Sequence, residues 1–395
     1  MDCSESIALR RIDVLIPVYN SAATIAGAIR SICAQTVGNL RIVVVDDGSS
    51  DETPRILAGM AACDARIVIV TIPHGGIVDA LNAGLAHCTA EFIARHDADD
   101  IAYPHRFATQ LAYLDANPDC VAVSSFARVV DMDGHPSGGR ATSLPDSFDP
   151  TWIPCREPLL LHPFLMVRRR AMLAIGGYRY VYHAEYVDLC WRLQEVGRLH
   201  AIPRPLGDYR MHAGSIMGLS TLNGRLSAIY SQLAAISALR RRSNARDLTF
   251  PKSAIDLMTA AVTTAGIFEI GKRELNSTES SHLKAAFAAK FLELASYRSY
   301  DIELDDCRFI RAVLRPVESQ LPAGNRKSIR WSRSVLGARL LSKGRLRAAM
   351  VMLSPDTLVK TGVRFGVHAL SRCLPARVRV AIWDRRARAW TSRLQ

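Results

Sequence analysis

The sequence predicts an α/β fold, a Rossmann-like and mostly parallel sheet with flanking helices, followed by a helical C-terminal region. Over the first 125 residues, apolar segments of strand length alternate with amphipathic segments of helix length. Strands that are apolar almost throughout indicate a parallel sheet covered on both faces. From about residue 222 the pattern is helical, with repeated Ala, Leu and Arg. We therefore expect domains at 1–220, 221–325 and 326–395.

The first two strands and the helices after them have separate signals. Residues 12–18, which are apolar except for Asp13, predict a buried strand, and Ser21 is placed to cap a helix whose apolar residues recur at helical spacing. Residues 41–46 form the second strand, and Asp47-Gly48 predicts a turn after it. The next helix begins at Thr53, because the proline that follows is tolerated in the first turn of a helix.

The remaining elements have the same two patterns. We expect strands over 66–70, 91–95, 120–124 and 162–169, helices over 77–88, 107–117 and 185–196, and a hairpin or long loop over 127–160. Ligands of such sheets bind beyond the carboxyl ends of the strands. The polar residues Tyr19-Asn20, Asp46-Asp47 and 97–99 come directly after three of the strands, so they should gather along one edge.

Composition excludes several classes of protein. Hydrophobic residues make up 49% and charged residues 22%, as in ordinary globular proteins. The nine cysteines are scattered and form no C-x-x-C pair, which favours reduced thiols and a cytoplasmic location over disulfides or a zinc site. The acidic N-terminus does not resemble a signal peptide. The apolar stretch at 257–268 is too short to span a bilayer.

The net charge of +13 comes from the end of the chain. Residues 326–395 contain 17 Lys or Arg and only two Asp. One interpretation is a solvated helical surface. The other is a patch that binds an anionic membrane surface, because basic residues alternate with large apolar ones between 364 and 383. The second would make the protein peripheral at the inner face of the plasma membrane. No nucleic-acid-binding motif accompanies the charge, so we expect no nucleic-acid partner.

An acidic cluster follows the strand predicted over 91–95. Asp97, Asp99 and Asp100 place three carboxylates within four residues. Mg²⁺ and Mn²⁺ prefer oxygen ligands and usually share them with substrate phosphates, so the cluster indicates a divalent metal that carries a nucleotide diphosphate. Asp97 and Asp99 would face the metal, whereas Asp100 would point away and hydrogen-bond locally. The alternative is an Asp-rich turn that caps the helix opening near Pro104.

Four short blocks resemble the family 2 glycosyltransferases, which are inverting enzymes of the GT-A fold. They are IPVYN at 16–20, VVDDGSSD at 44–51, NAGL at 82–85 and DADD at 97–100, and blocks at 162–163, 176–178, 188–189 and 209–212 agree with them. The resemblance covers residues 10 to 218. It implies a hexosyltransferase that uses a nucleotide-diphosphate sugar, with a UDP-sugar as first candidate, and a saccharide or lipid-linked saccharide acceptor. It also implies Mn²⁺ or Mg²⁺ and a role in cell-surface polysaccharide synthesis.

The resemblance implies roles in nucleotide-sugar binding for Pro17, Tyr19, Asp46, Asp47 and Asp97. An aromatic ring such as that of Tyr19 offers a stacking face, and a carboxylate accepts hydrogen bonds from uracil N–H or ribose hydroxyl groups. Two alternatives stay open. Tyr19 could instead be a core aromatic residue, and one of Asp46 and Asp47 should serve a turn with the glycine after them.

The resemblance also implies that Asp97 and Asp99 hold the metal. His212, in the Tyr-Arg-x-His motif, would be a further metal or phosphate contact, or else a loop histidine with a structural hydrogen bond. The metal would neutralise charge on the leaving nucleotide diphosphate.

The catalytic base departs from the family pattern. Inverting transfer needs a base that takes the proton of the acceptor hydroxyl, and the family usually presents a Glu-Asp pair whose Asp is that base. Tyr186 occupies the Asp position here. We hypothesise that the base is Glu185 or Asp188, which are three residues apart and share a helix face. Alternatively, Asp188 pairs with Arg192 and Glu185 serves the helix N-terminus.

Other functions fit the sequence less well. A sugar nucleotidylyltransferase normally has a Gly-rich loop after the first strand, where this chain has PVYNS at 17–21. A dehydrogenase would need G-x-G-x-x-G after a strand, which is absent. The remaining alternative is a catalytically degenerate scaffold protein that binds a nucleotide sugar but lost its base at Tyr186.

Overall fold

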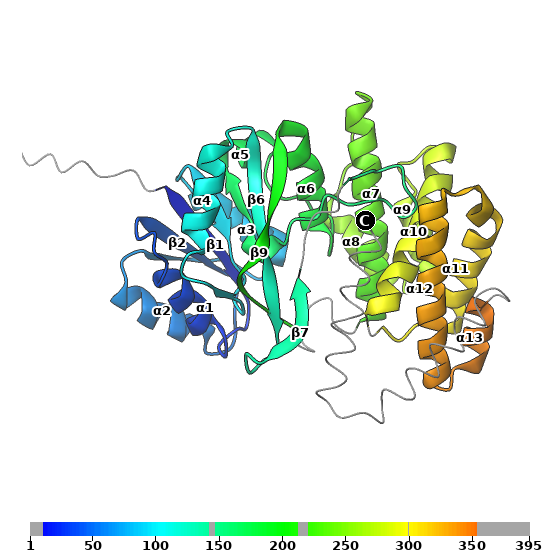
Figure 1. Ribbon diagram of the computed structural model, residues 1–395, viewed down its shortest axis with the longest axis horizontal. Helices are drawn as coiled ribbons and strands as arrows, with labels where there is room; N and C mark the ends of the chain where they lie inside the picture. The colour runs from blue at the N-terminus through cyan, green and yellow to red at the C-terminus, as the bar shows by residue number, and fades with distance from the viewer. Residues whose placement is uncertain (1–10, 142–146, 212–219, 299, 354–395) are drawn as a thin grey trace, which may run out of the picture. The chain divides into compact units, whose positions relative to one another are not determined.

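The computed structural model describes residues 11–141, 147–211, 220–298 and 300–353 (Figure 1). The chain forms two compact units. Unit 1 comprises Met1–Leu144, Pro158–Arg179 and Leu189–Met211, and unit 2 comprises Pro145–Glu157, Tyr180–Asp188 and His212–Gln395. Two short segments from within the first 220 residues therefore belong to the second, helical unit.

A nine-stranded sheet is the centre of unit 1 in the part of the chain that is described. Its strands are β1 (Ile12–Val18), β2 (Leu40–Asp46), β3 (Ile67–Thr71), β4 (Phe92–Arg95), β5 (Ile101–Ala102), β6 (Cys120–Val130), β7 (Pro136–Ala141), β8 (Met166–Arg168) and β9 (Arg198–Arg210). The order is β3-β2-β1-β4-β8-β6-β9-β5, with β7 paired to β6. Neighbours among β1 to β4 are parallel, as are β6 and β9, while β8 is antiparallel to both β4 and β6. The predicted mostly parallel sheet is confirmed.

Six α-helices and one 3₁₀ turn flank or connect these strands in the described residues. They are α1 (Ile25–Cys33), α2 (Thr53–Cys63), α3 (Ile77–His87), α4 (Arg106–Ala116), η1 (His162–Phe164), α5 (Arg169–Ala174) and α6 (Glu185–Val196). The prediction that Ser21 caps the first helix is wrong. The Ser21 carbonyl accepts from the N–H groups of Thr24 and Ile25 at 3.0 Å, so a turn precedes α1 and Thr24 is its N-cap.

The helix α3 packs unusually close to the sheet. A Cβ atom added at Gly84 would lie 2.2 Å from Cδ1 of Leu15 and 2.7 Å from Cγ2 of Val45. Only glycine fits such an approach without displacing a neighbour. This contact fixes the position of the helix beside β1 and β2, whose carboxyl ends carry the candidate site.

Helices make up most of unit 2. They are α7 (Thr221–Arg242), α8 (Lys252–Ala260), α9 (Thr264–Gly271), α10 (Ser277–Tyr297), α11 (Leu304–Val317), η2 (Glu318–Gln320), α12 (Ala323–Ser342) and α13 (Leu346–Met352). The helix α10 packs against α7, α11 and α12, and this helical region confirms the prediction for the second half of the chain. Within the described residues, every helix is too short or too polar to cross a bilayer.

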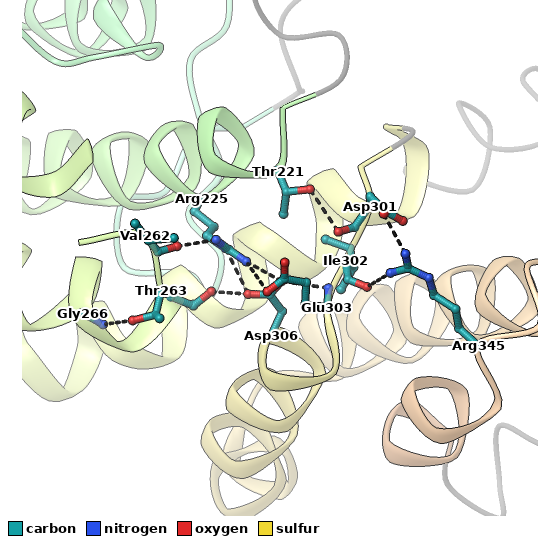
Figure 2. A network of polar contacts seen from close by, with 11 residues as sticks. Thr221, Arg225, Val262, Thr263, Gly266, Asp301, Ile302, Glu303, Asp306 and Arg345 are labelled. Atoms are coloured by element: carbon teal, nitrogen blue, oxygen red, sulfur yellow. Dashed lines mark hydrogen bonds and ion pairs between the residues drawn. The ribbon is translucent and has the colours of Figure 1, made fainter. Parts of the chain in front are cut away.

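A buried ion pair connects three of these helices (Figure 2). Arg225 on α7 donates through Nε and Nη2 to the two carboxylate oxygens of Asp306 on α11, at 3.0 and 2.8 Å. Thr264, the first residue of α9, donates to the same carboxylate at 2.5 Å. The carboxylate also accepts from the backbone N–H of Glu303 at 3.0 Å, and Arg225 donates to the carbonyl of Val262. Every oxygen of this buried carboxylate is thus satisfied by segments far apart in sequence.

Candidate active site

Polar side chains follow three neighbouring strands of unit 1. Val18 at the end of β1 pairs with Asp46 at the end of β2, and Leu15 pairs with Arg95 at the end of β4. Since these strands are parallel, the residues that follow them emerge at the same edge of the sheet. Tyr19, Asp47 and the acidic cluster therefore share this edge.

The acidic cluster is compact. One carboxylate oxygen from each of Asp97, Asp99 and Asp100 lies within 4.8 Å of the others. Asp97 forms an ion pair with Arg95, and it and Asp99 are partly exposed. Such a group of carboxylate oxygens suits a hard divalent cation.

Asp100 differs from its two neighbours because it is fully buried. Its Oδ1 accepts from the backbone N–H of Arg210 at 2.8 Å, which is the local hydrogen bond expected of it. Its Oδ2 has no hydrogen-bond partner in the described part of the chain. Burial, followed by the charges of Asp97 and Asp99, raises the pKa of Asp100 well above its ordinary value. A nearby cation would compensate this orphaned buried oxygen.

The acidic cluster does not cap the following helix, which was the alternative interpretation. The helix α4 begins at Arg106, its N-cap is His105, and no side chain caps it. The three carboxylates are therefore not explained by helix capping.

A network of buried hydrogen bonds around His96 and Arg106 holds the backbone of the acidic cluster. Nε2 of His96 donates to the carbonyl of Asp100 at 3.2 Å, and Nδ1 accepts from Nη1 of Arg106 at 3.1 Å. Arg106 also donates to the carbonyl of Arg95 at 2.6 Å and to Oε1 of Gln110 at 3.2 Å. Burial lowers the pKa of Arg106 to about 9 and lowers that of His96 well below its usual value, so this imidazole is neutral. The network fixes both ends of the acidic loop.

Sequence reasoning missed His96, Arg106 and Gln110. The available signals were a histidine at the end of an apolar strand, and an arginine with a glutamine four residues later at the start of an amphipathic helix. Such residues are ordinary on a solvated helix face, so their burial could not be predicted from local pattern alone.

Asp46 and Asp47 both hold backbone groups. Oδ1 of Asp46 accepts from the N–H of Ser49 at 3.0 Å, so Asp46 is the one that serves the turn. Asp47 is almost fully buried, and its two oxygens accept from the N–H groups of Gly75 and Gly76 at 2.8 and 2.9 Å. This carboxylate thereby connects the end of β2 to the loop before α3.

The Tyr19 side chain is 46% exposed, so it is not a core aromatic residue. Its ring stacks on that of His74, with centroids 4.1 Å apart and planes inclined by 22°. Pro17, by contrast, is buried within β1. The stacking face predicted for Tyr19 at the carboxyl edge of the sheet is therefore formed by two stacked rings, those of Tyr19 and His74.

The candidate base residues lie in the first turn of α6. Glu185 is 8% exposed and Asp188 is completely buried. Burial, and then the charge of Glu157, raises the pKa of Tyr186 far above its ordinary value. A phenol that stays protonated cannot take over the role of the missing aspartate. His212, the proposed further metal contact, lies outside the described residues.

A mostly parallel sheet with flanking helices and an acidic cluster at its carboxyl edge places the chain among α/β proteins of the GT-A type. The family profile described as "Glycosyl transferase family 2" matches residues 13–176. The chain belongs to glycosyl transferase family 2 and is a glycosyltransferase, which confirms the resemblance found in the sequence.

Two relatives illustrate this membership. The chain is 30% identical over 192 residues to the putative glycosyltransferase EpsE of Bacillus subtilis. The aligned region covers 47% of this chain and 68% of EpsE. The chain is 31% identical over 189 residues to the amylovoran biosynthesis glycosyltransferase AmsE of Erwinia amylovora, spanning 47% and 70%. The mannosyltransferase PcManGT of Pyrobaculum calidifontis, solved with GDP-Man and Mn²⁺, superimposes with a TM-score of 0.48 at 16% identity over 96% of this chain and 88% of PcManGT.

Proposed function

We propose that this glycosyltransferase transfers a sugar from a nucleotide-diphosphate sugar to a hydroxyl acceptor with inversion, and that a UDP-sugar is the first donor to test. The observation that carries the proposal is the acidic cluster, which shares the carboxyl edge of the sheet with a pair of aromatic rings. The relative AmsE is named for amylovoran biosynthesis, which supports a saccharide or lipid-linked saccharide acceptor and a role in cell-surface polysaccharide synthesis.

Asp97 and Asp99 would hold Mn²⁺ or Mg²⁺. Their oxygens are partly exposed, they belong to one compact group, and the buried Oδ2 of Asp100 in the same group lacks a hydrogen-bond partner among the described residues. All three observations fit a divalent cation that shares its coordination sphere with a diphosphate. When bound, the ion supplies charge neutralisation at the leaving nucleotide diphosphate. His212 remains the proposed additional contact.

Glu185 or Asp188 would take the proton from the acceptor hydroxyl. We place Glu185 first, because it keeps some exposure whereas Asp188 has none. The test measures turnover of Glu185→Gln and Asp188→Asn, with Glu195→Gln, at an exposed position of the same helix, as the control. Loss of the base should lower kcat by about 10²-fold or more, while the control stays near the parent value. Unchanged turnover in both variants would remove these residues as candidates.

A donor panel tests the proposed reaction itself. The purified chain is incubated with UDP-, GDP- and CDP-sugars in the presence and absence of Mn²⁺, and release of the nucleoside diphosphate is detected by mass. Metal-dependent release supports the enzyme. Tight nucleotide binding without release from any donor would favour the scaffold alternative, which the tyrosine at position 186 motivates.

We further propose that the C-terminal region places the protein peripherally at an anionic membrane surface, on the cytoplasmic side where its donor would be available. Residues 354–395 contain nine Lys or Arg and two Asp, and each basic residue near such a surface contributes about 1 kcal/mol. The residues between 364 and 383 on which this proposal depends lie outside the described residues.

A further inference from the structure

The acidic loop is joined to β9 by the short strand that comes directly after it. Ile101 and Ala102 form β5, which pairs with Asp208 and Gly207 of β9. A Cβ atom at Gly207 would lie 2.3 Å from the carbonyl oxygen of Ile101, so only glycine allows the two strands to approach this closely. Because the pairing is antiparallel, the residues after Asp208 run back past the acidic loop. Arg210, the last residue of β9, therefore lies beside this loop.

Arg210 holds the acidic loop through both its main chain and its side chain. Its backbone N–H donates to Oδ1 of Asp100 at 2.8 Å, and Nε of its guanidinium donates to the carbonyl oxygen of Asp99 at 2.8 Å. Nη1 donates in another direction, to the carbonyl oxygen of Asp131 at 3.2 Å and to that of Met132. A guanidinium group presents its N–H donors in a rigid plane, so one side chain holds both segments at once.

The segment that receives Nη1 is the turn between β6 and β7, and this turn is itself ordered. Oδ1 of Asp131 accepts from the backbone N–H groups of Asp133 at 3.0 Å and of His135 at 2.9 Å. The backbone N–H of Asp131 donates to the carbonyl of His135 at 3.0 Å, which closes the turn. The guanidinium therefore connects the acidic loop to a support whose shape is fixed by its own hydrogen bonds.

A guanidinium group at this place has two opposite effects on cation binding. Its positive charge repels a divalent cation, so the charge alone weakens cation affinity. Its bond to the Asp99 carbonyl fixes the backbone from which that carboxylate projects, so a cation loses less conformational entropy on binding. In the described residues all three hydrogen bonds of the guanidinium go to backbone carbonyl oxygens. This geometry is that of a clamp on the main chain, not of an ion pair with the cluster.

We propose that Arg210 is a positioning residue of the cation site, which presents the Asp99 carboxylate to a divalent cation by holding the Asp99 backbone against the β6–β7 turn. The positioning effect outweighs the repulsion between the guanidinium and the cation. This inference rests on the cation site of the proposed function and adds a residue that acts on the site through the backbone of Asp99. It predicts that removal of a positive charge beside the acidic cluster weakens the binding of a cation.

The test titrates the full chain with Mn²⁺, alone and in excess UDP, and follows the electron paramagnetic resonance signal of free Mn²⁺. Arg210→Met removes the clamp and the charge at similar volume, but keeps the main-chain bond to Asp100. Its affinity for Mn²⁺ should fall by about tenfold, which corresponds to the cost of ordering the backbone of one residue. Arg204→Met is the matched control and should keep the parent affinity, because Arg204 is exposed on the same strand and its side chain donates to Thr109.

The direction of the change separates the two effects. Unchanged or tighter Mn²⁺ binding by Arg210→Met would mean that charge repulsion dominates, and it would overturn the positioning role while leaving the proposed function in place. An equal loss of affinity in Arg204→Met would overturn the role as well. Failure of the parent protein to bind Mn²⁺ in either condition would overturn the proposed cation site and this inference with it.

Arg210→Lys separates geometry from charge. Lysine keeps the positive charge, but its ammonium group is a single point on a flexible stem and cannot hold both segments in one plane. This variant should lose part of the Mn²⁺ affinity although its charge is unchanged, and an affinity equal to that of the parent protein would overturn the proposal. Arg210→Lys also replaces Arg210→Met if the thermal melt of the methionine variant shows that it does not fold.

Discussion

Asp99 is the residue whose replacement tests the proposed metal site most directly. Asp99→Asn removes one charged oxygen ligand but keeps the side-chain volume, so Mn²⁺ should no longer strengthen UDP binding and kcat should fall by about 10²- to 10³-fold. Asp133→Asn is the matched control, because Asp131, Asp133 and His135 form a second acidic group, in which Asp133 is exposed. Calorimetry with and without Mn²⁺ measures the effect, and an equal loss in both variants would contradict the assignment.

Tyr186 allows a second prediction at this scale. Its phenol stays protonated because burial raises its pKa, so Tyr186→Phe should leave kcat within about threefold of the parent value. Initial rates with an active donor and acceptor measure this. A loss comparable to that of Glu185→Gln would mean that the hydroxyl takes part in proton transfer after all.

The residues of the site were predictable to different degrees. The acidic cluster and Tyr19 could be found from sequence, because each comes directly after an apolar strand and the carboxyl ends of parallel strands lie at one edge of the sheet. His74 and Arg106 could not, because their roles depend on contacts with residues 27 and 10 positions away respectively. No local periodicity encodes such contacts.

At the scale of elements, α7 and α10 are joined by the ion pair of Arg240 with Glu279. The distances are 2.8 and 2.7 Å, and Glu279 also completes a capping box with Asn276 at the start of α10. The side-chain hydrogen bond from Arg240 lowers the pKa of Glu279. A carboxyl group with a lowered folded-state pKa stabilises the protein above its unfolded pKa of about 4.3, and this stability is lost as the pH falls through the folded value.

Glu279→Gln should therefore lower the free energy of unfolding by about 1 to 2 kcal/mol at pH 7. The difference from the parent protein should shrink as the pH is lowered below about 4. Urea titrations across this pH range measure it. Glu269→Gln, which removes an exposed pair with Lys272, is the control and should change the free energy of unfolding by less than about 0.5 kcal/mol.

Helices and strands with a regular pattern of apolar residues could be predicted from the sequence, whereas strands interrupted by prolines or register shifts could not. The strands β1 and β2 match their predicted ranges to within one residue, because they are apolar except for Asp13, Arg41 and Asp46. The strand predicted over 162–169 is instead a 3₁₀ turn followed by the short β8, since Pro163 cannot donate to a ladder. The long β9 was missed because it contains two prolines and pairs with β6 through several register shifts.

At the scale of the whole molecule, unit 2 depends on the buried pair of Arg225 and Asp306. Asp306→Ala leaves the guanidinium buried without its partner and should destabilise the unit by about 3 to 5 kcal/mol. Asp305→Ala is the matched control, because the neighbouring Asp305 is exposed and pairs only one turn away. Denaturant unfolding followed by circular dichroism measures both, and similar losses would contradict the role given to the pair.

The packing of α12 and α13 determines which truncation is suitable for testing membrane binding. α12 and α13 pack against other helices of unit 2, so truncation at residue 325 would remove part of a folded unit. Truncation after Leu353 removes seven net positive charges and should greatly reduce sedimentation with anionic liposomes. Equal sedimentation of the full and truncated chains would exclude the membrane patch, and neutral liposomes serve as the control.

The network of His96 and Arg106 has a consequence for how tightly the acidic loop could bind a ligand. Its hydrogen bonds join protein atoms only, so the loop holds its shape through the fold itself. Binding of a cation and a diphosphate would then require little ordering of the backbone, and less conformational entropy would be lost on association. Pre-organisation of this kind would strengthen the binding of such ligands without any additional contact.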